Sequence, residues 1–136
     1  MRLSARIEYA CLALVALARH GTSEKLVHAR VIAEDYQIPE NYLAQILLQL
    51  KAAGLIYSTR GTLGGYRLAR PADAISLHEV FSAIEGPEVQ PRDPQGLGAS
   101  ILAPVVEHLR AAERTALRQV NMAQLAERAA PREWVI

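Results

Sequence analysis

The sequence has 136 residues, enough for one domain or for one domain with an added dimerising helix. Hydrophobic residues make up 51% and charged residues 21%, which excludes wholesale disorder, and the low aromatic share of 5% favours helices over a β-sandwich. The net charge of +1 is unevenly spread: residues 1–70 hold nine Lys/Arg against five Asp/Glu, and residues 71–136 hold six against nine. A basic first half suggests a polyanion-binding head, and an acidic second half suggests a partner-binding tail.

The sequence also restricts where the protein works. Its single cysteine, Cys11, excludes an intrachain disulfide framework and favours a reducing compartment. The longest apolar run, residues 11–18, is too short to span a bilayer, and no secretory signal is visible. We therefore expect a cytoplasmic protein that does not enter a membrane.

The first three predicted elements are helices. Residues 4–20 have apolar side chains at helical spacing, with Ser4 as the N-cap. Residues 28–36 predict a short second helix and residues 39–53 a third, with Pro39 at its first helical position. Two short helices joined by a three- or four-residue turn are typical of a helix-turn-helix.

A β-hairpin is predicted next. Strand-like residues 55–59 and 66–69 flank the glycine-rich turn at residues 60–65. Arg60 and Arg67 place positive charge on this hairpin. A hairpin directly after the second helix of a helix-turn-helix is a wing.

The remaining residues predict a linker and a long helix. Ser76 and Glu79 form a capping box that opens a helix, and residues 86–98 carry three prolines and three glycines. Residues 99–120 are helical, with Pro104 either near the start or at a kink. The apolar residues of this helix follow a coiled-coil-like seam that predicts pairing with a second copy: Leu102, Val105, Leu109, Ala112 and Ala116. The tail after residue 120 holds one short helix at most.

Taken together, these motifs resemble the Rrf2 family of bacterial winged-helix transcription regulators. The matching segments are Met1–Ser4 with Tyr9-Ala10, residues 38–47, residues 54–56, Arg60-Gly61, residues 64–69 and residues 76–80. The resemblance implies a mainly α fold with a small β-hairpin wing: a winged helix-turn-helix in residues 1–85, a linker in 86–98, and a dimerisation helix with its tail in 99–136. It also implies a homodimer that binds a pseudo-palindromic operator in double-stranded DNA and represses transcription.

Candidate DNA contacts lie on three elements. The first turns of a recognition helix reach base edges in the major groove, where Asn and Gln can pair with adenine and Glu with cytosine. Arg60 is expected in the minor groove and Arg67 on a phosphate. The Tyr42 ring is equally consistent with a phosphate contact and with core packing. The full set comprises Ser4, Arg6 and Tyr9 near the first helix start, Glu40, Asn41, Tyr42 and Gln45 on the third helix, and Arg60, Gly61, Thr62, Tyr66 and Arg67 on the wing.

No cofactor, metal or catalytic site is expected. Many members of the family hold an iron–sulfur cluster through three linker cysteines, but residues 87–98 contain none, so the chain resembles the cluster-free branch. Cys11 lies on the apolar stripe of the first helix and is interpreted as a core residue. The four histidines show no ligand spacing, and no nucleophile or paired-carboxylate motif suggests an enzyme.

Two other functions stay open at this point. The chain is also consistent with a winged-helix module that binds a partner protein rather than DNA. A refinement of the regulator hypothesis adds a small-molecule effector or a partner protein as the signal. DNA binding would fall steeply with salt, which separates a regulator from an interaction module.

Overall fold

The computed structural model describes residues 3–20, 25–86 and 95–129. The helices and strands in chain order are α1 (Ala5–His20), α2 (Ala29–Tyr36), α3 (Glu40–Ala52), β1 (Ile56–Thr59), β2 (Gly65–Leu68), the short 3₁₀ helix η1 (Ala72–Ala74), α4 (Leu77–Glu85), α5 (Leu97–Arg118) and α6 (Met122–Ala129). This order confirms the predicted winged helix: helices dominate, and the two strands form one antiparallel hairpin.

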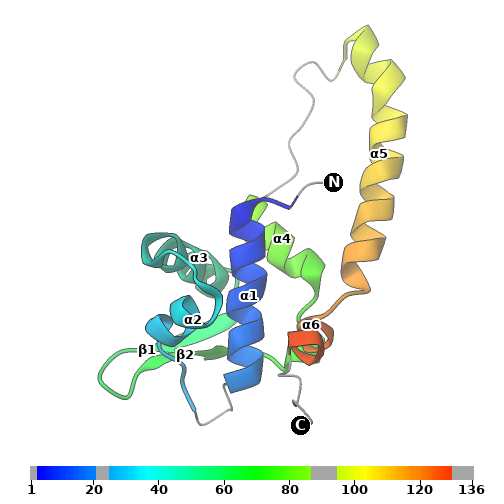
Figure 1. The fold of residues 1–136 in the computed structure, drawn as a ribbon. Coiled ribbons are helices and arrows are strands. Elements are labelled where there is room, and N and C mark those ends of the chain that lie inside the picture. The colour runs from blue at the N-terminus through cyan, green and yellow to red at the C-terminus, as the bar shows by residue number, and fades with distance from the viewer. Residues whose placement is uncertain (1–2, 21–24, 87–94, 130–136) are drawn as a thin grey trace.

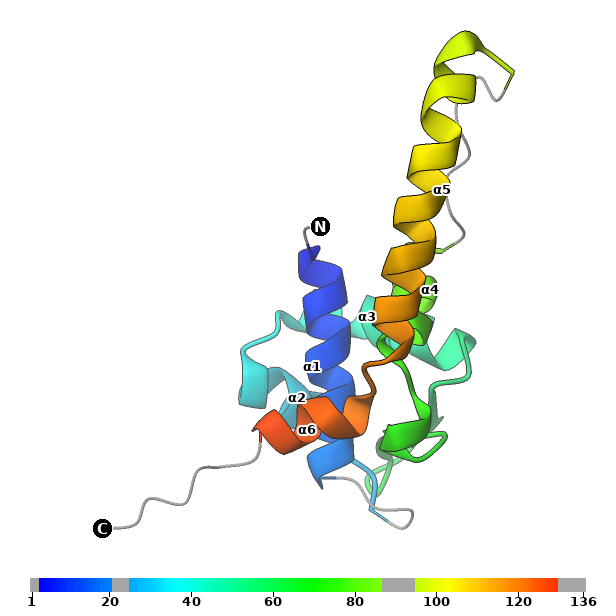
Figure 2. The same ribbon diagram turned by 90° about the vertical axis from the view of Figure 1, so that its right-hand side faces the viewer.

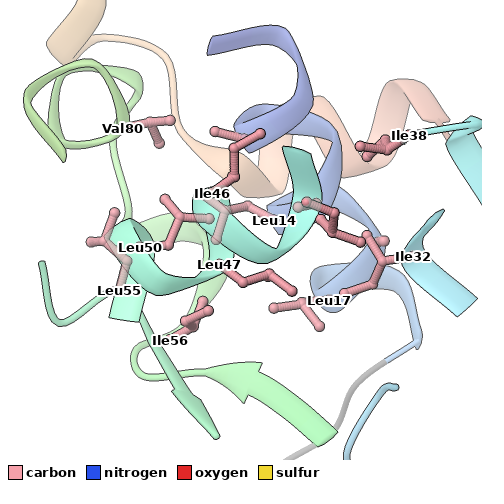
Figure 3. Packing of buried hydrophobic residues seen from close by; sticks show 14 of the residues in the cluster. Leu14, Leu17, Ile32, Ile38, Ile46, Leu47, Leu50, Leu55, Ile56 and Val80 are labelled. Atoms are coloured by element: carbon pink, nitrogen blue, oxygen red, sulfur yellow. The ribbon is translucent and has the colours of Figure 1, made fainter. Parts of the chain in front are cut away.

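Helix α1 runs through the middle of a head formed by α2, α3, α4, α6 and the hairpin (Figure 1). The predicted stripe of α3 is buried against it, with Leu43, Ile46, Leu47 and Leu50 each at most 1% exposed. Figure 3 shows how these side chains meet Leu14 and others from neighbouring elements. Because burying one such side chain contributes about 1.5–3 kcal/mol, this core fixes the position of α3 in the head.

Hydrogen bonds at the helix ends set where the helices begin. The Ser4 hydroxyl accepts from the Ile7 amide at 3.2 Å, as expected for an N-cap. Ser76 and Glu79 form the predicted capping box at the start of α4. Pro39 lies at the N-cap of α3, one position before the place predicted for it, because its backbone is still extended.

One residue outside the hairpin adds backbone hydrogen bonds that join it to the head. Strand β1 pairs with β2 in antiparallel register, with Tyr57 opposite Arg67. Val27, just before α2, exchanges two backbone hydrogen bonds with Tyr66 at 2.8 and 2.9 Å. Strand β2 is therefore flanked by β1 on one side and by Val27 on the other.

Helix α5 extends away from the head, and α6 packs back against α1 (Figure 2). With 22 residues, α5 is about 33 Å long. The helix begins seven residues before Pro104 and continues through it, so the alternative in which the helix starts near the proline is wrong. Its one buried residue, Leu117, packs against Ile7 and Phe81. Most of the predicted linker, residues 87–94, lies outside the described residues.

Within the described ranges, no helix combines the length and the apolar character needed to cross a membrane.

Candidate nucleic-acid interface

One face of α3 is buried in the head and the other is exposed. Glu40 and Asn41 are exposed in its first turn, and Gln45 is exposed one turn later. Asn41 and Gln45 lie four residues apart, so their side chains share one face of the helix. The buried stripe directs these three polar side chains outward, as base reading in a major groove requires.

The aromatic rings of Tyr9 and Tyr42 meet beside this face. Their centroids lie 6.2 Å apart at an interplanar angle of 62°, an edge-to-face contact between α1 and α3. Tyr42 is nevertheless 46% exposed, while Tyr9 is half-buried. Tyr42 is therefore not a core residue: its ring packs on Tyr9 at the surface, and its contact with a phosphate stays a prediction.

The wing carries positive charge and no acidic residue. Residues 55–72 contain three arginines and neither Asp nor Glu. Arg60 is exposed at the end of β1, and the Arg67 guanidinium lies 4.7 Å from the centre of the Tyr57 ring. This cation–π contact holds Arg67 over the hairpin surface. Gly61 and Thr62 are exposed in the turn, whereas Tyr66 is half-buried and its backbone is bonded to Val27.

The wing turn needs glycine at two positions. The amide of Gly64 donates to the Gly61 carbonyl at 3.0 Å, and a Cβ on Gly64 would lie 2.1 Å from the Thr59 carbonyl oxygen. Gly65 has a φ of +145°, and a Cβ there would lie 2.7 Å from the Val27 carbonyl oxygen. Side chains at these positions would push the hairpin open or away from the head.

Two of the predicted phosphate contacts are engaged within the protein. The Ser4 hydroxyl caps α1, and the Arg6 guanidinium donates to the Gln49 side-chain oxygen of α3. The Gln49 amide nitrogen in turn lies 3.5 Å from the Ile84 carbonyl oxygen of α4. Arg6 therefore ties α1 to α3, and contact of Arg6 with DNA stays a prediction.

Figure 1 shows α3 and the wing on one side of the head and α5 on the other. The predicted seam of α5 is uncovered along its length, with Leu102 59%, Val105 56% and Leu109 60% exposed. Ala112 and Ala116 are exposed as well. The uncovered seam thus lies away from the exposed polar face of α3 and from the wing (Figure 1).

Sequence reasoning missed two residues that position this interface. Gln49 stands at the edge of the apolar stripe of α3, and periodicity cannot distinguish it from the exposed Gln45. Val27 forms an isolated bridge of a single residue, which leaves no alternating pattern to detect. Its neighbour Leu26 is equally apolar but only half-buried, so polarity alone does not single out Val27 as the buried residue.

Comparison with known proteins places the chain among regulators. A model of the Rrf2 family, described as an iron-dependent transcriptional regulator, matches residues 3–128. Rv1287 of Mycobacterium tuberculosis, which carries the name of a helix-turn-helix-type transcriptional regulator, is 38% identical over 138 residues, covering 96% of this chain and 84% of that protein. The regulator IscR of Cereibacter sphaeroides is 40% identical over 86 residues, covering 62% of this chain and 56% of that protein.

Solved structures agree with this placement. The structure of T. potens IscR matches with a TM-score of 0.78 at 27% identity, covering 100% of this chain and 93% of that one. CymR, the global cysteine regulator of B. subtilis, matches with a TM-score of 0.74 at 27% identity, covering 93% and 97%. These proteins are transcriptional regulators and not enzymes, which confirms the expected class of this chain.

The residues of this chain do not fit a thiolate-bound iron centre. Such clusters are held mainly by several cysteine thiolates, and the whole sequence contains one cysteine. Burial, with a smaller contribution from the Glu8 charge, raises the pKa of the Cys11 thiol to about 11, so it stays protonated at neutral pH. In the part of the chain that the structure describes, no three His, Cys, Asp or Glu residues gather as a possible metal site.

Proposed function

The chain belongs to the Rrf2 family of DNA-binding transcriptional regulators, and we propose that it acts as a homodimeric repressor on a pseudo-palindromic operator. The head binds the DNA, and α5 is the dimerisation helix, which begins at Leu97, two residues earlier than the sequence predicts. The protein acts in the cytoplasm, where the chromosome lies. Its signal is a small-molecule effector or a partner protein, because its residues do not fit a thiolate-bound cluster.

The polar face of α3, beside the basic wing, is the observation that carries the proposal. Glu40, Asn41 and Gln45 are exposed on a helix that a buried stripe holds rigidly. In this arrangement α3 enters the major groove, and Arg60 enters the adjacent minor groove, where the negative potential is concentrated. Tyr42, Thr62 and Arg67 then lie beside these residues and contact the sugar–phosphate backbone.

The uncovered seam of α5 supports a dimer. Its leucines and valine are more than half exposed in the single chain, and pairing with a second copy buries them. Two heads joined in this way read two half-sites about one DNA turn apart, roughly 34 Å. A two-fold protein axis requires a palindromic site.

The test is selection of genomic fragments by the purified full-length chain at near-physiological salt. We expect enrichment of one palindromic sequence, with affinity that falls steeply as salt rises. Gln45→Ala and Arg60→Ala should weaken binding to this site, and loss of one base contact in each half-site should cost about 2–6 kcal/mol.

Ser100→Ala is the matched control, because Ser100 is exposed on α5, and Figure 1 shows α5 on the other side of the head from α3 and the wing. Unchanged affinity in both the Gln45 and Arg60 variants would contradict the proposed contacts. Enrichment of non-palindromic fragments, or a monomer at the bound site, would contradict the dimeric mode of binding.

A further inference from the structure

Leu63 is the most exposed large hydrophobic side chain in the part of the chain that the structure describes. It is 91% exposed, compared with 78% for Leu97, the next in order. The hydrogen bond from the Gly64 amide to the Gly61 carbonyl makes Thr62 and Leu63 the central residues of the wing turn. Figure 1 shows this turn projecting beyond the helices of the head. Leu63 therefore stands at the outer tip of the wing and contributes nothing to the core.

The base of the wing is built to hold this tip in place. Val27 bonds both ways to Tyr66, and Gly65 packs so tightly on Val27 that no side chain fits between them. At the turn, a Cβ on Gly64 would likewise clash with the Thr59 carbonyl oxygen. A hairpin that is fixed at both ends presents its tip at little entropic cost on binding.

The charge around Leu63 indicates what it contacts. Arg60 lies three residues before it, and Arg67 lies four residues after it. Residues 55–72 contain no acidic side chain, so the wing is suited to a polyanion. A leucine within a basic hairpin of a DNA-binding protein matches the apolar wedges that enter base steps from the minor groove.

We propose that Leu63 inserts between two stacked base pairs from the minor groove, partly unstacks them and bends the operator. This inference rests on the docking of the wing proposed above and adds a site of its own, the base step under the tip. Arg60 supplies attraction to the narrow groove and Leu63 supplies the wedge. In a dimer the two wings bend the DNA at two symmetric positions.

The proposed wedge predicts a preference for certain base steps in the operator, at a position where the protein makes no hydrogen bond to a base. Unstacking is easiest at pyrimidine–purine steps such as TA and CA. The selected operator should therefore carry such a step at equal distances from its centre, under each wing tip.

The experiment uses the full-length protein and a duplex of the site that it selects. In one set of duplexes 2-aminopurine replaces one adenine at a time, and a rise in its fluorescence reports unstacking. In another set, dyes at the two ends of the duplex report the bend by energy transfer. With the wild-type protein we expect 2-aminopurine fluorescence to rise at one step in each half-site, and the DNA to bend by at least about 20° at each wedge. Leu63→Ala and Leu63→Gln should lose both signals, whereas Leu63→Met, with an apolar side chain of similar volume, should keep them.

The variants separate this inference from the docking of the wing. Arg60→Ala should weaken binding strongly, while Leu63→Ala should change affinity less, because the lost contact is offset by restored base stacking. If Arg60→Ala leaves affinity unchanged, the wing does not dock and both proposals fail. If Arg60→Ala weakens binding but Leu63→Ala keeps the bend and the fluorescence rise, the wedge alone is wrong.

Discussion

The environment of Cys11 suits packing and not chemistry. The side chain packs between α1 and its neighbours in both buried clusters. A thiol whose pKa rises from 9.0 to about 11 holds its proton more tightly in the folded chain than in the unfolded one. Its contribution to stability is therefore complete below pH 9 and declines as the pH rises toward 11.

We predict slow alkylation of Cys11 in the folded protein. At pH 8 the thiolate fraction is about 100-fold lower than for the unfolded chain, since the pKa is raised by about two units. Iodoacetamide labelling followed by mass spectrometry measures both rates, with the urea-unfolded chain as reference. Labelling at equal rates would contradict the buried position, and Cys11 is the only cysteine that can react.

Gly65 is the residue on which attachment of the wing depends. In Gly65→Ala, the new methyl group meets the Val27 backbone at 2.7 Å and the φ of +145° is strained. Gly61→Ala is the matched control, because its φ of +109° is strained too but nothing lies within 4 Å. Urea unfolding followed by circular dichroism should show a loss of about 1–3 kcal/mol for the control and a further 1–3 kcal/mol for Gly65→Ala. Equal losses would show that the contact with Val27 is unimportant.

At the scale of the element, α3 connects the DNA-facing side of the head with its interior. Gln45 faces outward, whereas Gln49 is half-buried and receives the Arg6 guanidinium. Through the Ile84 carbonyl, Gln49 also reaches the last turn of α4. One side chain of α3 thus hydrogen-bonds to both α1 and α4, in addition to the core packing between these helices.

The two glutamines should therefore respond differently to truncation. Gln49→Ala leaves the half-buried Arg6 guanidinium without its acceptor and should lower the free energy of unfolding by about 1–2 kcal/mol. Gln45→Ala should leave stability within about 0.5 kcal/mol of the wild type, because the side chain is exposed. Thermal or urea unfolding measures both. A larger loss from Gln45→Ala than from Gln49→Ala would reverse these roles.

At the scale of the whole molecule, the head and helix α5 present two different surfaces. The head buries its apolar side chains in two clusters beside α1, while α5 exposes Ile101, Leu102, Val105 and Leu109. A contiguous exposed apolar surface marks an interaction site in a soluble protein. The proposed dimer surface on α5 and the proposed DNA-binding surface on α3 and the wing thus lie on opposite sides of the head (Figure 1).

We predict that Leu109→Glu prevents self-association. A charge in the seam would be buried without a partner, which costs several kcal/mol on pairing. Light scattering after gel filtration should show the mass of one chain, 14.9 kDa, where the wild type shows twice that mass.

Ser100→Glu is the control for this variant. It adds the same charge to α5 nine residues earlier, on the opposite side of the helix from Leu109. It should remain dimeric. A dimeric Leu109→Glu variant would contradict pairing through the seam.

Local patterns were enough to predict the helices, the hairpin and the capping box of α4. Apolar residues at helical spacing, a Ser–Glu pair three residues apart and a glycine-rich turn are each determined by neighbours in the chain. The exposed residues Glu40, Asn41 and Gln45 followed from the same periodicity, since the face opposite the buried stripe must meet solvent. The sequence alone left open where Pro104 lies in the long helix. In the structure it lies within α5, with helical turns on both sides of it.

Contacts between distant residues were decided by the tertiary structure alone. Arg6 and Gln49 are 43 residues apart, and Val27 meets Tyr66 across the whole helix-turn-helix. No periodicity relates such pairs, because they meet only after the core has packed α1, α3 and the wing together. For the same reason the exposure of Leu63 at the wing tip became evident only in the folded chain. The sequence by itself determined the elements and the family, and the packing of the head decided which polar side chains hold it together and which remain exposed to solvent.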